Sequence, residues 1–230
     1  LGQLICNTVI RLILNFLDMS QMIPGKFITL EGIDGAGKST HLLWLESLLE
    51  GMGKNIVATH EPGGTPLGER LRSILLDSRQ TMHPETEALL MFAARREHLD
   101  KLILPALTKG EWVISDSFTD ASFAYQGGGR GLSEDKLDGL EHWVQGEFQP
   151  DLTFYFDVTS ELGRKRLNNR GDGVESIDRF EKEEGEFFDR VRESYLKRAR
   201  KFSHRIHIID SSQSLESIRL KLKDIILTIC

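Results

Sequence analysis

The feature that most constrains this chain is a glycine-rich segment that fits the pattern G-x-x-x-x-G-K-[ST] and runs from Gly32 to Ser39. A short apolar run typical of a β-strand, Lys26–Glu31, precedes it, and an amphipathic helical pattern, Ser39–Met52, follows it. A strand, this loop and then a helix is the context in which the pattern forms a phosphate-binding loop, or P-loop. The alternative is a glycine-rich turn with an incidental lysine, and the agreement of pattern and context argues against it.

The loop is suited to bind a nucleoside triphosphate. Glycines let the backbone wrap closely around a phosphate, and N–H groups at the helix N-terminus point at it. Lys38 is expected to bridge the β- and γ-phosphates, and the Ser39 hydroxyl to ligate Mg²⁺. The residues expected to hold ATP and Mg²⁺ are Gly32, Ile33, Asp34, Gly35, Ala36, Gly37, Lys38, Ser39 and Thr40.

The rest of the chain alternates strand-like runs with helical patterns. Further strands are expected at Asn55–Thr59, Trp112–Ser115, Leu152–Val158 and Ile206–Ile209. Further helices are expected at Pro66–Asp77, Pro84–Leu107, Ser133–Phe148, Ser160–Asn169, Phe180–Phe202 and Leu215–Ile226. This alternation predicts an α/β fold of three layers, a five-stranded parallel sheet flanked by helices.

The length of the chain, 230 residues, suits one domain, which we place at residues 24–230. Residues 1–23 are interpreted as an N-terminal extension, either disordered or the product of a mis-called translation start. Their apolar stretch is interrupted by Asn7, Arg11 and Asn15, and it is too short to span a bilayer.

Charge and cysteine content narrow the partners and the compartment. A net charge of -6 argues against non-specific binding to nucleic acid or to an anionic membrane. The two cysteines, Cys6 and Cys230, lie at opposite ends of the chain and form no paired spacing. This favours a reducing, cytoplasmic compartment and argues against a structural metal.

A P-loop alone leaves GTPases, motors, transporter subunits and kinases open. The chain is too short for the larger machines, and no segment resembling the guanine-reading NKxD pattern is present. A kinase remains, and it requires a second site that holds the acceptor anion.

Five segments resemble those of the bacterial thymidylate kinases, a family of P-loop nucleoside monophosphate kinases, in content, order and spacing. The resemblance covers about residues 25–228 and implies transfer of the γ-phosphoryl of ATP to dTMP, giving dTDP for dTTP synthesis. It also implies Mg²⁺, a cytoplasmic homodimer, and a short arginine-rich lid at about residues 164–178. The segments are GIDGAGKST (32–40), EPGGTPLGERLR (61–72), LLMFAARREHL (89–99), DSFTDASFAYQGGGRG (116–131) and GRKRLNNRGDGVESIDRFE (163–181).

The resemblance also implies an acceptor site. Arg72 grips the acceptor phosphate, as a bidentate guanidinium does well, and Arg95 reads the thymine base. Asp34 accepts a hydrogen bond from the 3′-OH, and Tyr125 lies near the 2′ position and discriminates against ribonucleotides. The expected dTMP residues are Asp34, Glu61, Arg72, Phe92, Arg95, Ser122, Tyr125 and Gln126.

Two of these residues have an ordinary structural alternative. Arg72 could be a solvated charge on an amphipathic helix. The aromatic residue that usually packs on the base aligns with Met91 here, so its neighbour Phe92 is assigned instead, and core packing explains either residue equally well.

The remaining catalytic charges are expected from the lid and from the end of a strand. Ala36 stands where some relatives have an arginine, so a lid arginine must supply charge to the transferring phosphoryl group, and we assign Arg170 together with Arg166. A solvated basic helix surface is the alternative. Asp116 follows the strand Trp112–Ser115, where an acidic group near Mg²⁺ is usual. The expected catalytic residues are Lys38, Arg166, Arg170 and Asp116, with Ser39 and Asp116 as metal ligands.

Two positions depart from the family pattern. Ser117 replaces an arginine expected between the donor and acceptor phosphates, and His60 stands where arginine is common. A kinase for another deoxynucleoside monophosphate or for a deoxynucleoside, and a nucleotide-binding relative with little activity, therefore remain as alternatives.

Overall fold

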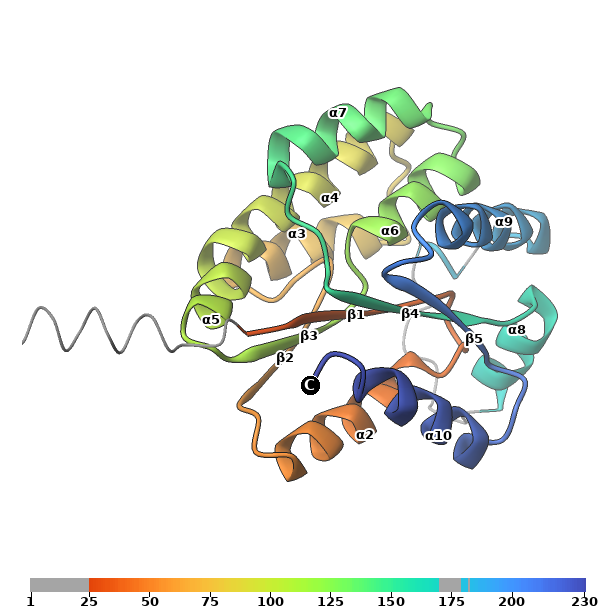
Figure 1. Cartoon of the computed structure of the whole chain (residues 1–230). Coiled ribbons are helices and arrows are strands. Elements are labelled where there is room, and N and C mark those ends of the chain that lie inside the picture. The colour runs from red at the N-terminus through yellow and green to blue at the C-terminus, as the bar shows by residue number, and fades with distance from the viewer. Residues whose placement is uncertain (1–24, 170–178, 182) are drawn as a thin grey trace, which may run out of the picture.

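The computed structural model describes residues 25–169, 179–181 and 183–230, and within them five strands form one parallel sheet in the order β2-β3-β1-β4-β5 (Figure 1). Each strand begins and ends within one residue of its expected position, so the predicted α/β sheet is confirmed. Residues 1–23, the expected extension, and residues 170–178 of the expected lid lie outside the described residues. The strands are β1 (Phe27–Glu31), β2 (Ile56–His60), β3 (Trp112–Asp116), β4 (Leu152–Asp157) and β5 (Ile206–Asp210).

The burial of β1 and β2 agrees with their places in the sheet. All of β1 is buried, as expected of a central parallel strand covered on both faces. Its neighbour β4 is held in register by a buried hydrogen bond of 2.8 Å between the hydroxyls of Thr29 and Thr153. The edge strand β2 is only partly buried. Because β2, β3 and β1 are parallel neighbours, their carboxyl ends lie at the same edge of the sheet.

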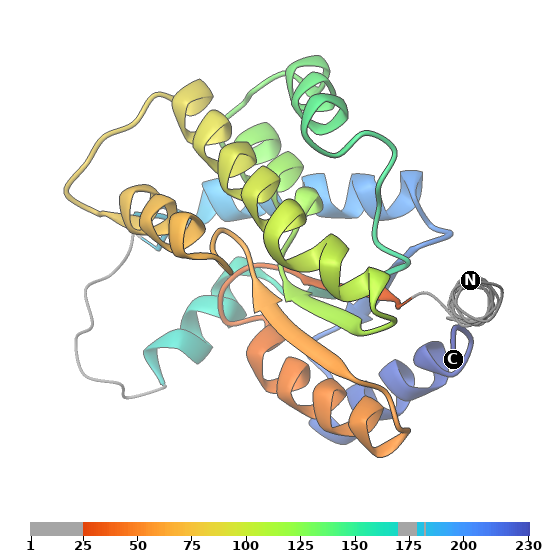
Figure 2. The same ribbon diagram turned by 90° about the vertical axis from the view of Figure 1, so that its left-hand side faces the viewer.

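Helices cover both faces of the sheet, and Figures 1 and 2 show α2 and α10 on one face and α3, α4, α6, α7 and α9 on the other. The bounds are α2 (Lys38–Gly51), α3 (Pro66–Leu76), α4 (Pro84–His98), α5 (Leu104–Thr108), α6 (Thr119–Ser122), α7 (Glu134–Gln145), α8 (Ser160–Asn168), α9 (Gly185–Lys201) and α10 (Leu215–Ile226), with π-helical turns η1 (Leu99–Ile103) and η2 (Phe123–Gly129). The core under α2 and α10 includes Leu45, Leu49, Ile218 and Leu222, and the core under α4 and α7 includes Phe92, Phe118 and Leu137.

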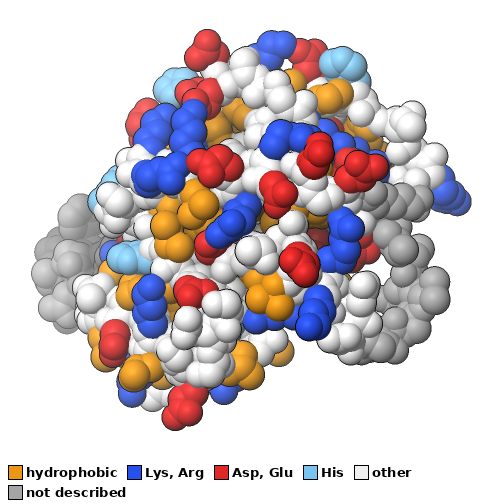
Figure 3. All heavy atoms as spheres, turned by 90° about the vertical axis from the view of Figure 1, so that its right-hand side faces the viewer, with side chains coloured by type: hydrophobic (Ala, Val, Ile, Leu, Met, Phe, Trp, Pro, Cys, Tyr) orange, Lys and Arg blue, Asp and Glu red, His pale blue; other side chains and the backbone are white. Residues whose placement is uncertain are grey.

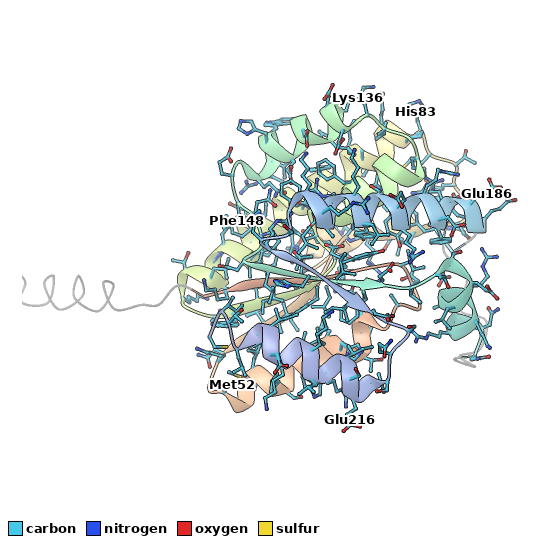
Figure 4. The ribbon with its side chains drawn as sticks, turned by 45° about the vertical axis from the view of Figure 1, so that its right-hand side comes forward. Met52, His83, Lys136, Phe148, Glu186 and Glu216 are labelled. Carbon is cyan, nitrogen blue, oxygen red and sulfur yellow. The ribbon has the colours of Figure 1, made fainter. Side chains whose placement is uncertain are left out.

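Outside this core, α4 and α7 meet at their N-terminal ends. His83 caps α4, and Lys136 lies near it at the outer end of this helical layer (Figure 4). Lys136 forms an ion pair with Glu85 in the first turn of α4, where a carboxylate favours the helix dipole. The pair is exposed and therefore contributes little to stability.

The helix expected at Pro84–Leu107 is interrupted in the structure. A π-helical turn, η1, separates α4 from α5 because Pro105 has no N–H to donate to the carbonyl four residues earlier. The expected Phe180–Phe202 helix also begins later than predicted, at Gly185. No helix among the described residues has the length and apolar character needed to cross a membrane.

Candidate active site

The P-loop lies between β1 and α2 and is closely packed. Gly35 has φ +79°, and a Cβ built there would lie 2.2 Å from the carbonyl oxygen of Gly163 on α8. Only glycine allows this approach, so α8 rests directly on the loop. The Lys38 ammonium is nearly buried and donates to the carbonyls of Gly32 at 2.8 Å and Ile33 at 3.4 Å.

Two carboxylates lie near the Lys38 ammonium, that of Asp34 at 3.8 Å and that of Asp116 at 3.9 Å. Asp34 comes from the loop itself, and Asp116 ends the neighbouring strand β3, whose register with β1 pairs it with Leu30. The structure thus brings together Lys38, Asp34 and Asp116, all expected from the sequence. This ammonium, held at the carboxyl ends of two strands, is placed to bind phosphate oxygens.

A cavity of about 160 Å³ opens beside the P-loop at the carboxyl ends of β1, β2 and β3. Over the face of the molecule toward which the strands point, Lys and Arg side chains alternate with Asp and Glu side chains (Figure 3). The lining residues are Gly32, Asp34, Lys38, His60, Glu61, Pro62, Arg72, Leu76, Met91, Asp116, Ser117, Ala121, Tyr125, Gln126 and Phe180. Seven residues of the expected dTMP and catalytic sets therefore line one cavity: Asp34, Lys38, Glu61, Arg72, Asp116, Tyr125 and Gln126.

Arg95 lies behind the cavity wall and is completely buried. Its Nε donates to Glu61 at 2.8 Å, and its Nη2 donates to the carbonyl of Phe118 and to the hydroxyl of Ser122, both at 3.1 Å. Glu61 is also bonded to His98 at 3.0 Å. The remaining Arg95 nitrogen, Nη1, is buried and has no hydrogen-bond partner among the described residues. A buried donor left over in this way is what a ligand acceptor requires.

The residues around Arg95 take different positions from those expected. Phe92 does not line the cavity, because its ring lies against the Arg95 guanidinium, 4.6 Å from ring centroid to Cζ, and belongs to the core. Met91 lines the cavity in its place. Ser122 is also behind the wall and anchors Arg95. The lining thus favours Met91 over Phe92 as the residue of α4 that faces the cavity, a choice between two adjacent apolar residues that the sequence alone did not indicate.

Arg72 on α3 lines the cavity on the side of the β2–α3 turn. Its Nη1 donates to the carbonyl of Pro62 at 3.0 Å, which fixes the guanidinium over the opening. The first turn of α3 is set by Thr65, whose hydroxyl accepts from the N–H of Gly68 at 2.9 Å. Beside it, Nε2 of His60 lies 2.8 Å from the carboxylate of Glu69. The turn thus presents the guanidinium of Arg72 to the cavity, and His60 stands where the resemblance led us to expect a second arginine.

Ser117 occupies a strained turn at the end of β3. It has φ +71°, the one positive φ outside glycine among the described residues. The turn is held by Glu31, whose carboxyl accepts from the N–H of Phe118 at 2.8 Å and from the Tyr195 hydroxyl at 2.9 Å. Burial, together with the nearby Asp120 carboxylate, raises the pKa of Glu31 to about 8. Ser117 lines the cavity, and the buried Glu31 carboxyl holds the backbone of the turn next to it.

The expected lid residues fall partly within the described part of the chain. Arg170 lies outside it. Arg166, at the end of α8, donates to the carbonyl of Ser211 at 2.7 Å, to its hydroxyl at 3.1 Å and to the carbonyl of Gly35 at 3.4 Å. In this arrangement Arg166 joins α8 to the P-loop and does not line the cavity.

The residues present fit a Mg²⁺ ion bound together with a nucleotide. No three His, Cys, Asp or Glu side chains gather as a metal site in the described ranges. Mg²⁺ does not need such a cluster, because it commonly takes one or two protein ligands and completes its shell with phosphate oxygens and waters. The exposed Ser39 hydroxyl and the partly exposed Asp116 carboxylate are oxygen donors of the required kind, next to Lys38.

His41 gives this region a pH dependence. It lies in the first turn of α2, is 1 % exposed, and its ring stacks on that of Phe156 with centroids 5.2 Å apart. Burial, with the charges of Arg219 and Arg166, lowers the pKa of His41 from 6.5 to about 4. The folded protein therefore keeps His41 neutral between these values, whereas the unfolded chain binds a proton.

Because only the unfolded chain takes up this proton between pH 6.5 and 4, the free energy of unfolding is unaffected by His41 above pH 6.5 and falls as the pH is lowered toward 4. From pH 7 to pH 4, we expect the free energy of unfolding to fall by about 2–3 kcal/mol more in the unsubstituted chain than in His41→Phe. Urea denaturation at both pH values measures this difference. Equal losses in the two proteins would show that His41 is not the responsible group.

Comparison with known proteins identifies the family. The thymidylate kinase family model matches residues 30–222. The chain belongs to the thymidylate kinase family. A curated thymidylate kinase of Nitrosospira multiformis is 69 % identical over 205 residues, covering 89 % of this chain and 98 % of the relative. That of Nitrosomonas europaea is 62 % identical over 205 residues, covering 89 % and 94 %.

Solved structures agree with the sequence relatives. The crystal structure of a thymidylate kinase from Ehrlichia chaffeensis matches with a TM-score of 0.71 and 34 % identity, covering 89 % of this chain and 99 % of that one. The predicted resemblance to bacterial thymidylate kinases is thus confirmed, and the P-loop kinase fold with it.

Some residues of the thymidylate kinase cavity were not expected from the sequence. Phe180 lines the wall and packs edge-on against Tyr125, with ring centroids 5.5 Å apart. Arg179 and Glu87 form a buried ion pair directly behind it, with 2.6 Å between nitrogen and oxygen. The sequence signal that could have indicated this pair is Glu87, an acidic residue on the apolar face of α4, because a buried carboxylate needs a partner of opposite charge.

Proposed function

We propose that this chain transfers the γ-phosphoryl group of ATP to dTMP, giving ADP and dTDP. The observation that carries the proposal is two buried groups with no hydrogen-bond partner among the described residues: the Oε1 acceptor of Gln126, which lines the cavity, and the Nη1 donor of Arg95, which lies behind the cavity wall. Thymine presents the complementary pair, an O4 acceptor beside an N3–H donor. A wall that leaves both groups unpaired favours a base that satisfies both and disfavours one that does not.

Phosphoryl transfer on this framework needs positioning and charge more than proton transfer. The acceptor phosphate has a second pKa near ~6 and is already mostly dianionic at pH 7, so no general base is assigned. Arg72 binds the acceptor phosphate and Lys38 the donor phosphates, and both side chains line the same cavity. Asp34 accepts from the 3′-OH, and Tyr125 closes the sugar site. This arrangement holds two polyanions in line and offsets their repulsion.

Ser39 and Asp116 would hold Mg²⁺, which when bound neutralises charge on the donor phosphates. Lid arginines, with Arg170 foremost, complete the donor site in this proposal. Arg166 contributes by holding α8 against the P-loop through Ser211. An inactive nucleotide-binding role is not favoured, because Lys38, Arg72 and Gln126 line one cavity.

A panel of acceptors tests the proposal. Purified protein with ATP and Mg²⁺ should release ADP with dTMP as the preferred acceptor, with dCMP, dAMP, dGMP and thymidine at least about 10²-fold lower in kcat/KM. Equal turnover of several monophosphates would contradict thymine recognition, and thymidine as the preferred acceptor would contradict the role of Arg72.

We also propose a cytoplasmic location and a homodimer. The exposed apolar side chains of Leu67 and Ile74 on α3 and Leu89 on α4, two helices that pack together, support a second copy at this surface. Sedimentation equilibrium of the purified chain distinguishes a dimer from a monomer.

A further inference from the structure

Glu87, on α4, is a completely buried carboxylate with three side-chain donors. Nε2 of Gln126 lies 2.7 Å from its Oε1, while Nε of Arg130 lies 3.1 Å and Nη1 of Arg179 2.6 Å from its Oε2. The donors come from η2, from the residue after it and from the segment that leads into α9. None of these three contacts involves the P-loop, so the cluster is separate from the phosphate sites.

The carboxylate determines which way the Gln126 amide points. An amide has one donating end and one accepting end, whereas an ionised carboxylate only accepts. The turned amide would place its oxygen against the Glu87 oxygen, with two acceptors in contact and the amide donors lost. Gln126 therefore gives its nitrogen to Glu87, and its oxygen is left buried with no partner in the described ranges.

We infer that Glu87 is a positioning residue that selects a pyrimidine with a protonated N3, thymine or uracil, over cytosine, by fixing the acceptor end of Gln126 toward the base. Thymine and uracil donate N3–H to that oxygen. Cytosine has a lone pair at N3, so it would place two acceptors together. This inference rests on the proposed function, in which Gln126 faces the acceptor base.

Arg130 and Arg179 hold the Glu87 carboxylate in place. Arg130 also forms an ion pair with Glu183, and Arg179 donates to the carbonyl of Leu75 at 2.9 Å. Both guanidinium groups lie over the ring of Phe180, with Cζ 5.6 Å and 4.8 Å from its centroid. Glu87 is thus fixed from the side opposite Gln126, and a rotation of the amide would not be accommodated by a movement of the carboxylate.

The substitution Glu87→Gln tests the inference. A glutamine at this position can donate as well as accept, so the Gln126 amide can take either orientation. We expect the ratio of kcat/KM for dTMP to that for dCMP to fall about tenfold or more, with dUMP following dTMP. A purely structural role would lower the values for all three acceptors together and leave the ratio unchanged.

The matched control is Arg130→Met, which damages the same buried cluster but leaves the bond between Gln126 and Glu87. It should lower stability and keep the ratio. An equal fall of the ratio in Arg130→Met would overturn the inference, because general loosening would then explain both.

A third variant separates the inference from the proposed function. Gln126→Leu removes the acceptor itself and should lower the ratio at least as far as Glu87→Gln. An unchanged ratio in Gln126→Leu would contradict the base-reading role of Gln126. A lowered ratio there, with an unchanged ratio in Glu87→Gln, would overturn only the role of Glu87.

A measurement on the unsubstituted protein decides the matter if Glu87→Gln does not fold. The side-chain amide protons of Gln126, assigned by their loss in Gln126→Leu, should exchange slowly with solvent both before and after dTMP is added. Rapid exchange in the unliganded protein would show that the amide is not bound to Glu87 and would overturn the inference.

Discussion

Replacement of Lys38 by methionine is expected to lower kcat about 10²–10³-fold, because it removes the ammonium placed to bind the transferring phosphoryl group. In the structure this ammonium is nearly buried and donates to the P-loop carbonyls of Gly32 and Ile33. A charge held in this way needs no reorganisation when negative charge moves on the phosphates, so its loss lowers kcat more than it raises KM. Steady-state ADP release with saturating dTMP measures the effect.

The matched control is Lys26→Met, the same substitution just before the other end of β1. Lys26 pairs with Asp151 at 2.9 Å and is 32 % exposed, away from the cavity. We expect this variant to keep its turnover and its midpoint of urea denaturation. Lys38→Met should likewise stay folded, since methionine retains most of the aliphatic stem. A Lys38→Met enzyme within about fivefold of the unsubstituted kcat would remove Lys38 from the proposed mechanism.

The sequence predicted those parts of the fold that local pattern determines. The P-loop, all five strands and most helices follow from apolar periodicity and from where glycine and proline fall. The helical segment Thr119–Gly129 was not predicted, because three consecutive glycines favour a loop. The structure explains them by packing, since a Cβ on Gly128 would lie 2.6 Å from the Cβ of Ser194, and one on Gly129 2.5 Å from the ring of Phe187. Tertiary contact with α9 thus overrides local preference.

In the candidate site, too, residues placed by local pattern were predicted and residues placed by tertiary contacts were not. Residues next to the P-loop or at a strand end, such as Asp116, were assigned from position alone. Arg95 and Gln126 could be assigned from the resemblance, but their partners could not. That Glu61 fixes one and Glu87 the other depends on contacts across 34 and 39 residues of sequence. A single sequence contains no record of such pairs. The structure was therefore needed to show that Arg95 Nη1 and Gln126 Oε1 have no hydrogen-bond partner in the described part of the chain.

The position of Ser117 gives the second large expectation, a gain in activity. Among the described residues that line the cavity, the permanent positive charges are those of Lys38 and Arg72, against the carboxylates of Asp34, Glu61 and Asp116. Two bound polyanions would add further negative charge. One more charge-assisted contact to a phosphate is expected to lower the barrier by about 2–3 kcal/mol, so Ser117→Arg should raise kcat/KM for dTMP up to about 10²-fold.

The backbone accepts this substitution without new strain. Ser117 already has φ +71°, and the cost of that conformation is similar for serine and for arginine, since neither is β-branched. Its N–H donates to the carbonyl of Leu30 at 2.9 Å, so the main chain holds the turn, and the substitution removes the longer hydrogen bond of 3.3 Å from the Ser117 hydroxyl to Asp116. Ser117→Met is the matched control, with a long side chain but no charge. A gain in Ser117→Arg that Ser117→Met does not share would show that charge between the two phosphates limits turnover. Equal rates in both variants and in the unsubstituted chain would mean that the positive charges already present supply all the charge the reaction uses.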